Sequence, residues 1–137
     1  MARDRRVAAL ALGLHLVANA THGVPHTAIP VPLAPWQWAF VFGGIVLAPV
    51  AAFALLRRGR ARAGASLFAV SMAASLAFGA YFHYATPNPD HVNAVPAGPW
   101  RGPFRATALL VVADALGVLV GAWLAIGLRR NSAPAEA

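Results

Sequence analysis

Four long apolar runs, separated by short polar segments, constrain this chain more than any other feature. A helix needs about 20 mainly apolar residues to cross the hydrocarbon core of a bilayer. Only 11% of the residues are charged, against about 25% in a typical soluble domain. The sequence therefore predicts an all-α integral membrane protein. Residues 1–137 would form a single domain with spans at about 7–24, 38–56, 64–84 and 106–128.

The distribution of arginine predicts the orientation of these spans. Only Arg101 and Arg105 lie between the third and fourth spans, and the other arginines would lie on the opposite side of the membrane. Cytoplasmic loops carry an excess of basic residues. We therefore expect both termini to be cytoplasmic and the protein to lie in the plasma membrane. The arginines on the cytoplasmic side would be Arg3, Arg5, Arg6, Arg57, Arg58, Arg60, Arg62, Arg129 and Arg130.

Two proline-rich loops would join the spans on the outer side of the membrane. They cover about residues 25–35 and 85–105. Because proline restricts φ, both loops should be stiff. The expected fold is a four-helix transmembrane bundle, with both ends inside and an outer cap made of these two loops. The small polar tail at 131–137 should be mobile.

A stripe of polar side chains runs along the first span. His15, Asn19, His22 and His26 are spaced by four, three and four residues, which places them on one face of a helix. Polar side chains are costly in hydrocarbon, and they normally face the interior of a bundle or a watery cavity. The stripe therefore predicts a site inside the bundle.

Depth along the spans predicts that Asp114 meets the deep end of this stripe. At 1.5 Å per residue, His15 and Asp114 both lie near the midplane, and Asn19 lies close to them. A hydrogen bond from Asp114 to His15 or Asn19 could simply hold helices together. The same groups could instead relay protons or orient a metal-bound histidine.

The outer ends of the spans carry a second group of polar residues. His22 and His83 lie near the outer surface, and His26, His91 and Asp90 lie at the level of the loops. Neutral imidazoles suit zinc, copper or iron, and carboxylates can complete the ligand set. His22 and His83 could alternatively be the axial ligands of a haem. The histidines could also be plain anchors that form hydrogen bonds near the headgroups.

A ridge of small residues on the fourth span predicts close helix packing. Ala113, Gly117 and Gly121 recur every four residues, and small residues at this spacing let helix backbones approach closely. The ridge could pack against another membrane subunit or a second copy of the chain.

The composition argues against other classes of protein. The net charge of +7 does not indicate nucleic-acid binding, because the arginines lie between apolar spans and form no separate basic face. The chain has no cysteine, so thiolate ligands and thiol nucleophiles are excluded.

The first span also fits a secretory signal peptide, with a basic start, an apolar stretch and a small-x-small sequence at residues 18–20. We favour an intact helix, because His22 and His26 continue its polar face. In size and number of spans the chain resembles the small multidrug-resistance transporters. Their first helix carries a membrane-embedded glutamate, whereas this span has His15 and no acidic residue, so the resemblance assigns no role to any residue.

These observations favour a membrane protein whose outer histidines bind a transition metal or haem, in a redox, metal-handling or accessory role. One alternative is a structural or assembly subunit without a cofactor. The other is a small proton-coupled transporter that uses Asp114 and His15.

The arginine distribution leads to a test of orientation. Reporter fusions after residue 130 and within residues 57–62 should report a cytoplasmic location, and a fusion within residues 87–99 should report an external one. A cytoplasmic signal from the third fusion would overturn the predicted orientation, because it would place the outer histidines on the inner face.

Overall fold

The computed structural model describes residues 2–29 and 31–130, and this part of the chain is helical without any strand. Four of its helices are long and apolar enough to cross a membrane, as the sequence predicts. They cover Ala2–Ala28, Pro35–Arg57, Ala61–Ala85 and Arg101–Leu128. The expected mobile tail at 131–137 lies outside the described residues.

Three of the four helices change their winding along their length. The first is a single α-helix, α1 (Ala2–Ala28). The second consists of α2 (Pro35–Phe40), a π-helical segment (Val41–Leu47) and α3 (Ala48–Arg57). The third consists of α4 (Ala61–Ala80) and a π-helical segment (Tyr81–Ala85). The fourth consists of α5 (Arg101–Ala108), a 3₁₀ turn (Leu109–Val111) and α6 (Val112–Arg130).

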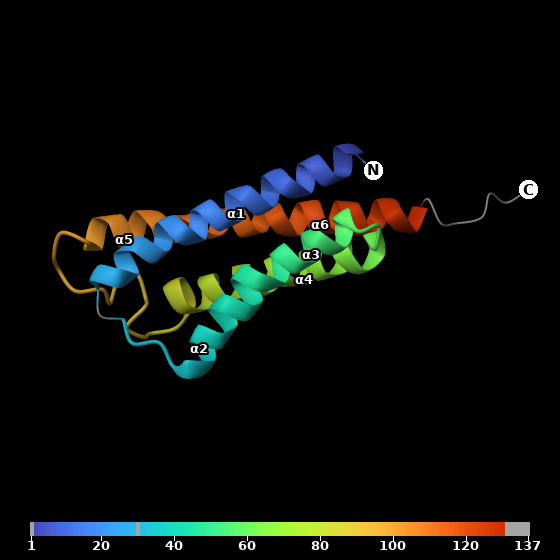
Figure 1. Cartoon of the computed structure of the whole chain (residues 1–137). Coiled ribbons are helices and arrows are strands. Elements are labelled where there is room, and N and C mark those ends of the chain that lie inside the picture. The colour runs from blue at the N-terminus through green and yellow to red at the C-terminus, as the bar shows by residue number, and fades with distance from the viewer. Residues whose placement is uncertain (1, 30, 131–137) are drawn as a thin grey trace, which may run out of the picture.

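The helices are arranged as two hairpins. The start of α1, the turn between α3 and α4, and the end of α6 lie at one end of the bundle (Figure 1). The connector between α1 and α2 and the loop over residues 86–100 lie at the other end. We call these the arginine end and the loop end.

Pro25 does not end the first helix, although the expected span ends at about residue 24 and the expected loop begins at about residue 25. α1 continues to Ala28, and the N–H of Ile29 still donates to the carbonyl of Pro25 at 2.9 Å. Proline removes one helical hydrogen bond, to the carbonyl four residues earlier, and Pro25 lies only one turn from the helix end. His22 and His26 therefore remain one turn apart on the same face of α1.

The core at the arginine end is apolar and closely packed. One cluster joins Ala11, Leu12, Ala52, Phe68 and Met72, and its side chains are buried. A second cluster, nearer the chain ends, consists of Ala8, Leu56, Ala65 and Leu124. The loop end has a smaller cluster of Ile29, Val95 and Phe104. The polar groups of the site lie between these apolar layers.

The ridge of small residues on α6 packs against α4 of the same chain. A Cβ on Gly121 would lie 2.6 Å from the Cα of Ala69, and a Cβ on Gly117 would lie 2.6 Å from the sulfur of Met72. Ala113 is buried in the same ridge. The predicted close approach is therefore present, but it joins two helices of one chain, and this face of α6 is not free for another subunit.

Gly121→Ala should lower the stability of the protein in detergent. Its new Cβ meets a backbone atom, and overpacking of this kind costs about 1–3 kcal/mol. Gly127→Ala is the matched control on the same helix, because no atom lies within 4 Å of its new Cβ and alanine favours helix by about 1 kcal/mol. Thermal unfolding should show a lower Tm for the first variant only. An unchanged Tm for Gly121→Ala would contradict the close approach of α4 and α6.

Candidate metal centre

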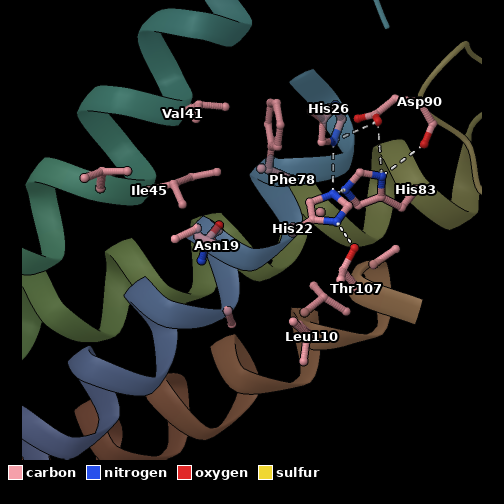
Figure 2. A pocket seen from close by; sticks show the side chains of 18 of the residues that line it. Asn19, His22, His26, Val41, Ile45, Phe78, His83, Asp90, Thr107 and Leu110 are labelled. Atoms are coloured by element: carbon pink, nitrogen blue, oxygen red, sulfur yellow. Dashed lines mark hydrogen bonds and ion pairs between the residues drawn. The ribbon is translucent and has the colours of Figure 1, made fainter. Parts of the chain in front are cut away.

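Three imidazoles from two helices converge at the loop end of the bundle (Figure 2). His22 and His26 come from α1, and His83 comes from the π-helical segment Tyr81–Ala85. The Nε2 of His22 lies 3.0 Å from the Nε2 of His83 and 3.0 Å from the Nε2 of His26. One ligand nitrogen from each ring lies within 4.8 Å of the others. We call these three residues the histidine cluster.

Local structure directs His83 into this cluster. The wide turn at Tyr81–Ala85 buries His83 and leaves Tyr81 and Tyr84 exposed. One turn below it, a Cβ on Gly79 would lie 3.0 Å from a methyl carbon of Val111. The glycine therefore lets the third and fourth helices approach each other beside the cluster.

The loop over residues 86–100 is held over the cluster by its own hydrogen bonds. The side chain of Asn88 donates to the carbonyl of Phe82 at 2.8 Å, and the N–H of Val92 donates to the carbonyl of His83 at 3.0 Å. The Nε of Arg105 donates to the carbonyl of Val92 at 2.7 Å. These bonds place Asp90, in the same loop, beside the imidazoles.

The Nδ1 atoms of His83 and His22 each have an oxygen partner. The Nδ1 of His83 lies 3.0 Å from the backbone carbonyl of Asp90, which can only accept, so this nitrogen is a donor. The Nδ1 of His22 lies 3.1 Å from the hydroxyl oxygen of Thr107. When that hydroxyl donates its proton to the carbonyl of Pro103, 2.8 Å away, it accepts from the Nδ1 of His22.

A neutral imidazole carries one N–H, so the Nε2 of a neutral His83 presents a lone pair toward His22. In the tautomer of His22 whose Nδ1 donates to Thr107, the Nε2 of His22 presents a second lone pair, and a metal ion between the rings can accept both. In the other tautomer the Nε2–H of His22 donates to His83, and the pair is satisfied without an ion. Two nitrogens that bind one ion must both present lone pairs, so metal binding selects the first tautomer. Two nitrogens bound at about 2.1 Å to one ion lie about 3.0 Å apart at a right angle and about 3.4 Å apart at a tetrahedral angle.

Asp90 adds a carboxylate to the edge of the cluster. Its Oδ1 lies 3.4 Å from the Nε2 of His26 and 3.5 Å from the Nδ1 of His83. Among the described residues, this buried oxygen has no hydrogen-bond partner. Burial raises the pKa of Asp90 to about 6, although the nearby His83 acts in the opposite direction. A cation in the cluster would favour the ionised form and stabilise this oxygen.

The geometry does not fit haem. Axial histidines must lie on opposite faces of the ring, with their nitrogens separated by two iron–nitrogen bonds, or about 4 Å at roughly 2 Å each. The Nε2 atoms of His22 and His83 are 3.0 Å apart, and His26 lies 3.0 Å from the same atom of His22. No macrocycle fits between these rings, so His22 and His83 are not placed as the two axial ligands of one haem.

The structure does not bring His91 into the cluster. Its Nε2 donates to the carbonyl of Tyr84 at 3.2 Å, and its Nδ1 accepts from the N–H of Asn93 at 3.1 Å. Both nitrogens of His91 are therefore used to shape the loop. The sequence groups His91 with the candidate metal ligands, whereas its contacts in the structure give it a structural role in the loop.

A second buried polar group lies deeper in the bundle. The Nδ1 of His15 is 2.5 Å from the Oδ1 of Asp114, and the hydroxyl of Ser75 donates to the Oδ2 of Asp114 at 2.7 Å. The Nε2 of His15 donates to the carbonyl of Ile45 at 2.7 Å. These groups come from all four helices, and we call them the deep network.

Proline makes the carbonyl of Ile45 available to His15. In an α-helix this carbonyl would accept from the N–H of residue 49, but Pro49 has none. The helix widens over Val41–Leu47, just before this proline. An internal proline often kinks a helix, and here it follows a wide turn whose carbonyl is used by another helix.

The deep network is electrically neutral as a whole. Because the carbonyl of Ile45 only accepts, the Nε2 of His15 carries a proton, and a second proton lies between the Nδ1 of His15 and Asp114. Whichever of the two atoms holds that second proton, the pair has no net charge. Asn19 donates to the carbonyl of His15 at 2.9 Å, and its side chain lies 3.2 Å from the ring, so it contacts His15 and not Asp114.

Sequence reasoning missed three of these partners. Ser75 was not singled out, although it lies eight residues, or about two turns, before His83 on the same helix face. Thr107 was not singled out, although it lies seven residues before Asp114 on one face of the fourth helix. The only indication in the sequence that the carbonyl of Ile45 is free to bind His15 is Pro49, four residues later, which has no N–H to donate to it.

One cavity of about 720 Å³ connects the two polar groups. The histidine cluster and Asp90 line its outer part, while Asn19, Ser75 and Asp114 line its deeper part. Figure 2 shows Val41 and Ile45, from the second helix, on the opposite side of the cavity from His22 and His83. Comparisons with protein-family models, curated proteins and solved structures found no match to this chain.

Asp114→Leu should destabilise the protein strongly, because it leaves the buried groups of His15 and Ser75 without a partner. Such a loss costs about 1–3 kcal/mol per group. Asp114→Asn keeps a hydrogen-bonding side chain and should be milder, but it should abolish any proton relay. Ser75→Ala should be mildly destabilising, and Ser66→Ala, at an exposed position on α4, is its control. Wild-type thermal stability in Asp114→Leu would contradict a structural role for the deep network.

Proposed function

We propose that this chain is a small membrane protein that binds a transition-metal ion through His22, His26 and His83. The ion would serve a redox, metal-handling or accessory role at the outer face of the plasma membrane. Zinc, copper and iron are the candidates, because all three accept neutral imidazole ligands.

One observation carries this proposal. The Nδ1 of His83 donates to a backbone carbonyl, and the Nδ1 of His22 lies at a hydroxyl oxygen that can accept from it, so the Nε2 atoms of both rings are turned toward each other at 3.0 Å. Metal-binding histidines commonly donate their second nitrogen to a carbonyl or another oxygen, which fixes the tautomer and the ring orientation. Asp90 supports the proposal by placing a negative charge at the edge of the cluster, next to the site where a cation would bind.

Three protein ligands also suit a reactive site. Structural zinc sites usually have four protein ligands, whereas catalytic sites have three and leave a position for water or substrate. Because the cluster has three histidines and borders a cavity, a bound ion would have a free position that faces this cavity. This feature favours a metal that acts on, or exchanges with, another molecule.

A second candidate function is proton-coupled transport through the deep network. It is favoured because Asp114 and Asn19 line the same cavity as the histidine cluster, so the deep network can be reached from the loop end. The apolar clusters at the arginine end would close the opposite side in this conformation. Proton-dependent flux in liposomes, abolished by Asp114→Asn, would support this function.

Metal content tests the main proposal. Protein stripped with a chelator and then loaded with zinc, copper or iron should retain about one ion per chain, measured by elemental analysis. His22→Ala and His83→Ala should weaken metal binding by more than about 100-fold. Even the loss of a residue that only hydrogen-bonds to a metal ligand lowers the affinity for the metal by about 10- to 100-fold. Thr107→Val removes a residue that hydrogen-bonds to His22, so it should weaken metal binding by about 10- to 100-fold.

His91→Ala is the matched control, because His91 is a histidine of the same loop region whose nitrogens are used elsewhere. It should bind metal like the wild type. If all three histidine variants retain the ion equally, or if the wild type binds none of the three metals, the proposal is wrong, and the three imidazoles are joined by hydrogen bonds alone.

A further inference from the structure

Seven exposed arginines gather at the arginine end of the bundle. They come from the start of α1 and from residues 57–62, which we call the arginine turn, and Figure 1 shows both segments at the same end. No hydrogen bond or ion pair joins their guanidinium groups to another described residue, and the only acidic residue described at this end is Asp4. The seven are Arg3, Arg5, Arg6, Arg57, Arg58, Arg60 and Arg62.

Apolar packing holds the two segments at the same level of the bundle. Ala8 of α1 and Leu56 of α3 are buried in the same cluster. Arg57 follows Leu56 directly, and Arg5 lies three residues, about one turn, before Ala8. The arginines of both segments therefore lie just beyond one shared apolar layer.

The arginine turn is too short to extend away from the bundle. α3 ends at Arg57 and α4 begins at Ala61, so three residues join the two helices. Both helices belong to segments that are long and apolar enough to cross a bilayer. In a membrane these guanidinium groups therefore lie at the level of the lipid headgroups, where phosphate groups are the nearest anions.

One face of α1 joins two of these arginines to a column of apolar side chains. Five exposed residues recur every three or four positions and so share this face, which lies away from the polar stripe of α1. Guanidinium groups at the end of the face and apolar side chains along it match the two parts of a phospholipid, its phosphate and its acyl chains. The five residues are Arg3, Arg6, Leu10, Leu14 and Val17.

The chemistry of arginine favours phosphate as the partner of these groups. A planar guanidinium can donate two parallel hydrogen bonds to one phosphate, and all basic residues of this chain other than histidine are arginines. The bias that orients membrane proteins requires only that basic residues lie on one side. Here the guanidinium groups are also free of protein partners and lie next to lipid-facing side chains.

We propose that the arginine end binds anionic phospholipids. Their phosphate groups lie on the guanidinium groups of the start of α1 and of the arginine turn, and their acyl chains lie along the exposed apolar faces of the helices. Phosphatidylcholine has a cation next to its phosphate, so a cluster of guanidinium groups favours a lipid with a net negative charge. This binding depends neither on the histidine cluster nor on the side of the membrane at which the arginine end lies.

Competition between two lipids tests the proposal. Dioleoylphosphatidylglycerol and dioleoylphosphatidylcholine have the same acyl chains and differ in headgroup charge. Delipidated protein in neutral detergent, offered equal amounts of both, should retain the anionic lipid over the other by about tenfold or more, measured by mass spectrometry. In about 1 M sodium chloride the preference should fall to about twofold or less, because salt screens exposed charges. Equal retention of the two lipids at low salt would overturn the proposal.

Two variants of the arginine turn test the location. Glutamine at all four of its arginines should lower the preference for the anionic lipid by about threefold or more, whereas lysine at the same positions should keep most of it, because lysine also binds phosphate. Circular dichroism should show wild-type helix content in both. The substitutions are Arg57→Gln, Arg58→Gln, Arg60→Gln and Arg62→Gln, and the same four to lysine.

Arg101→Gln is the control for these variants, because Arg101 begins α5 at the loop end. It should keep the wild-type preference for the anionic lipid. A wild-type preference in the glutamine variant, or an equal loss in Arg101→Gln, would overturn the proposed site.

Inorganic phosphate separates a lipid site from a site for a soluble anion. At about 10 mM, compared with chloride of equal ionic strength, it should leave the retained phosphatidylglycerol unchanged, because the acyl chains also hold the lipid. If inorganic phosphate displaces the lipid, the arginines bind free phosphate and the proposal is wrong.

Discussion

The hydrogen bond between His15 and Asp114 is the interaction on which the arrangement of the helices depends. A carboxylate deep in an apolar helix must find partners inside the bundle, and Asp114 finds them on α1 and α4. His15 in turn bonds the second helix through Ile45. Each of these short contacts limits how a helix can rotate about its axis. Because α1 is held in this way, the turn that carries His22 and His26 faces the end of the third helix, where His83 lies.

The bundle consequently has two different halves. At the arginine end, apolar clusters and the close contact between Gly121 and Ala69 leave little room for polar groups. At the loop end, α2 lies away from α1, and the polar groups border a cavity. The histidine cluster lies at the outer part of this cavity and the deep network lies below it. A ligand or proton that reaches the cluster can therefore also reach the surroundings of Asp114.

The metal proposal depends on the convergence of three imidazoles from two helices. The Nδ1 atoms of His22 and His83 each lie at an oxygen, the hydroxyl of Thr107 and the backbone carbonyl of Asp90, and these contacts orient both rings. The cavity beside the cluster leaves room for a further ligand on a bound ion.

The sequence alone determined the four apolar helices, the polar stripe of α1 and the depth at which Asp114 meets His15, because span length and helical spacing are local properties of the chain. Only the tertiary structure decided that His91 bonds its own loop, that the rings of His22 and His83 are too close for haem, and that the ridge at Gly117 and Gly121 packs inside the chain. It also decided the roles of Ser75, Thr107 and the carbonyl of Ile45. These outcomes depend on the rotation of each helix about its axis and on its angle to its neighbours. Both are set by contacts between residues far apart in the chain, which spacing along one helix does not encode.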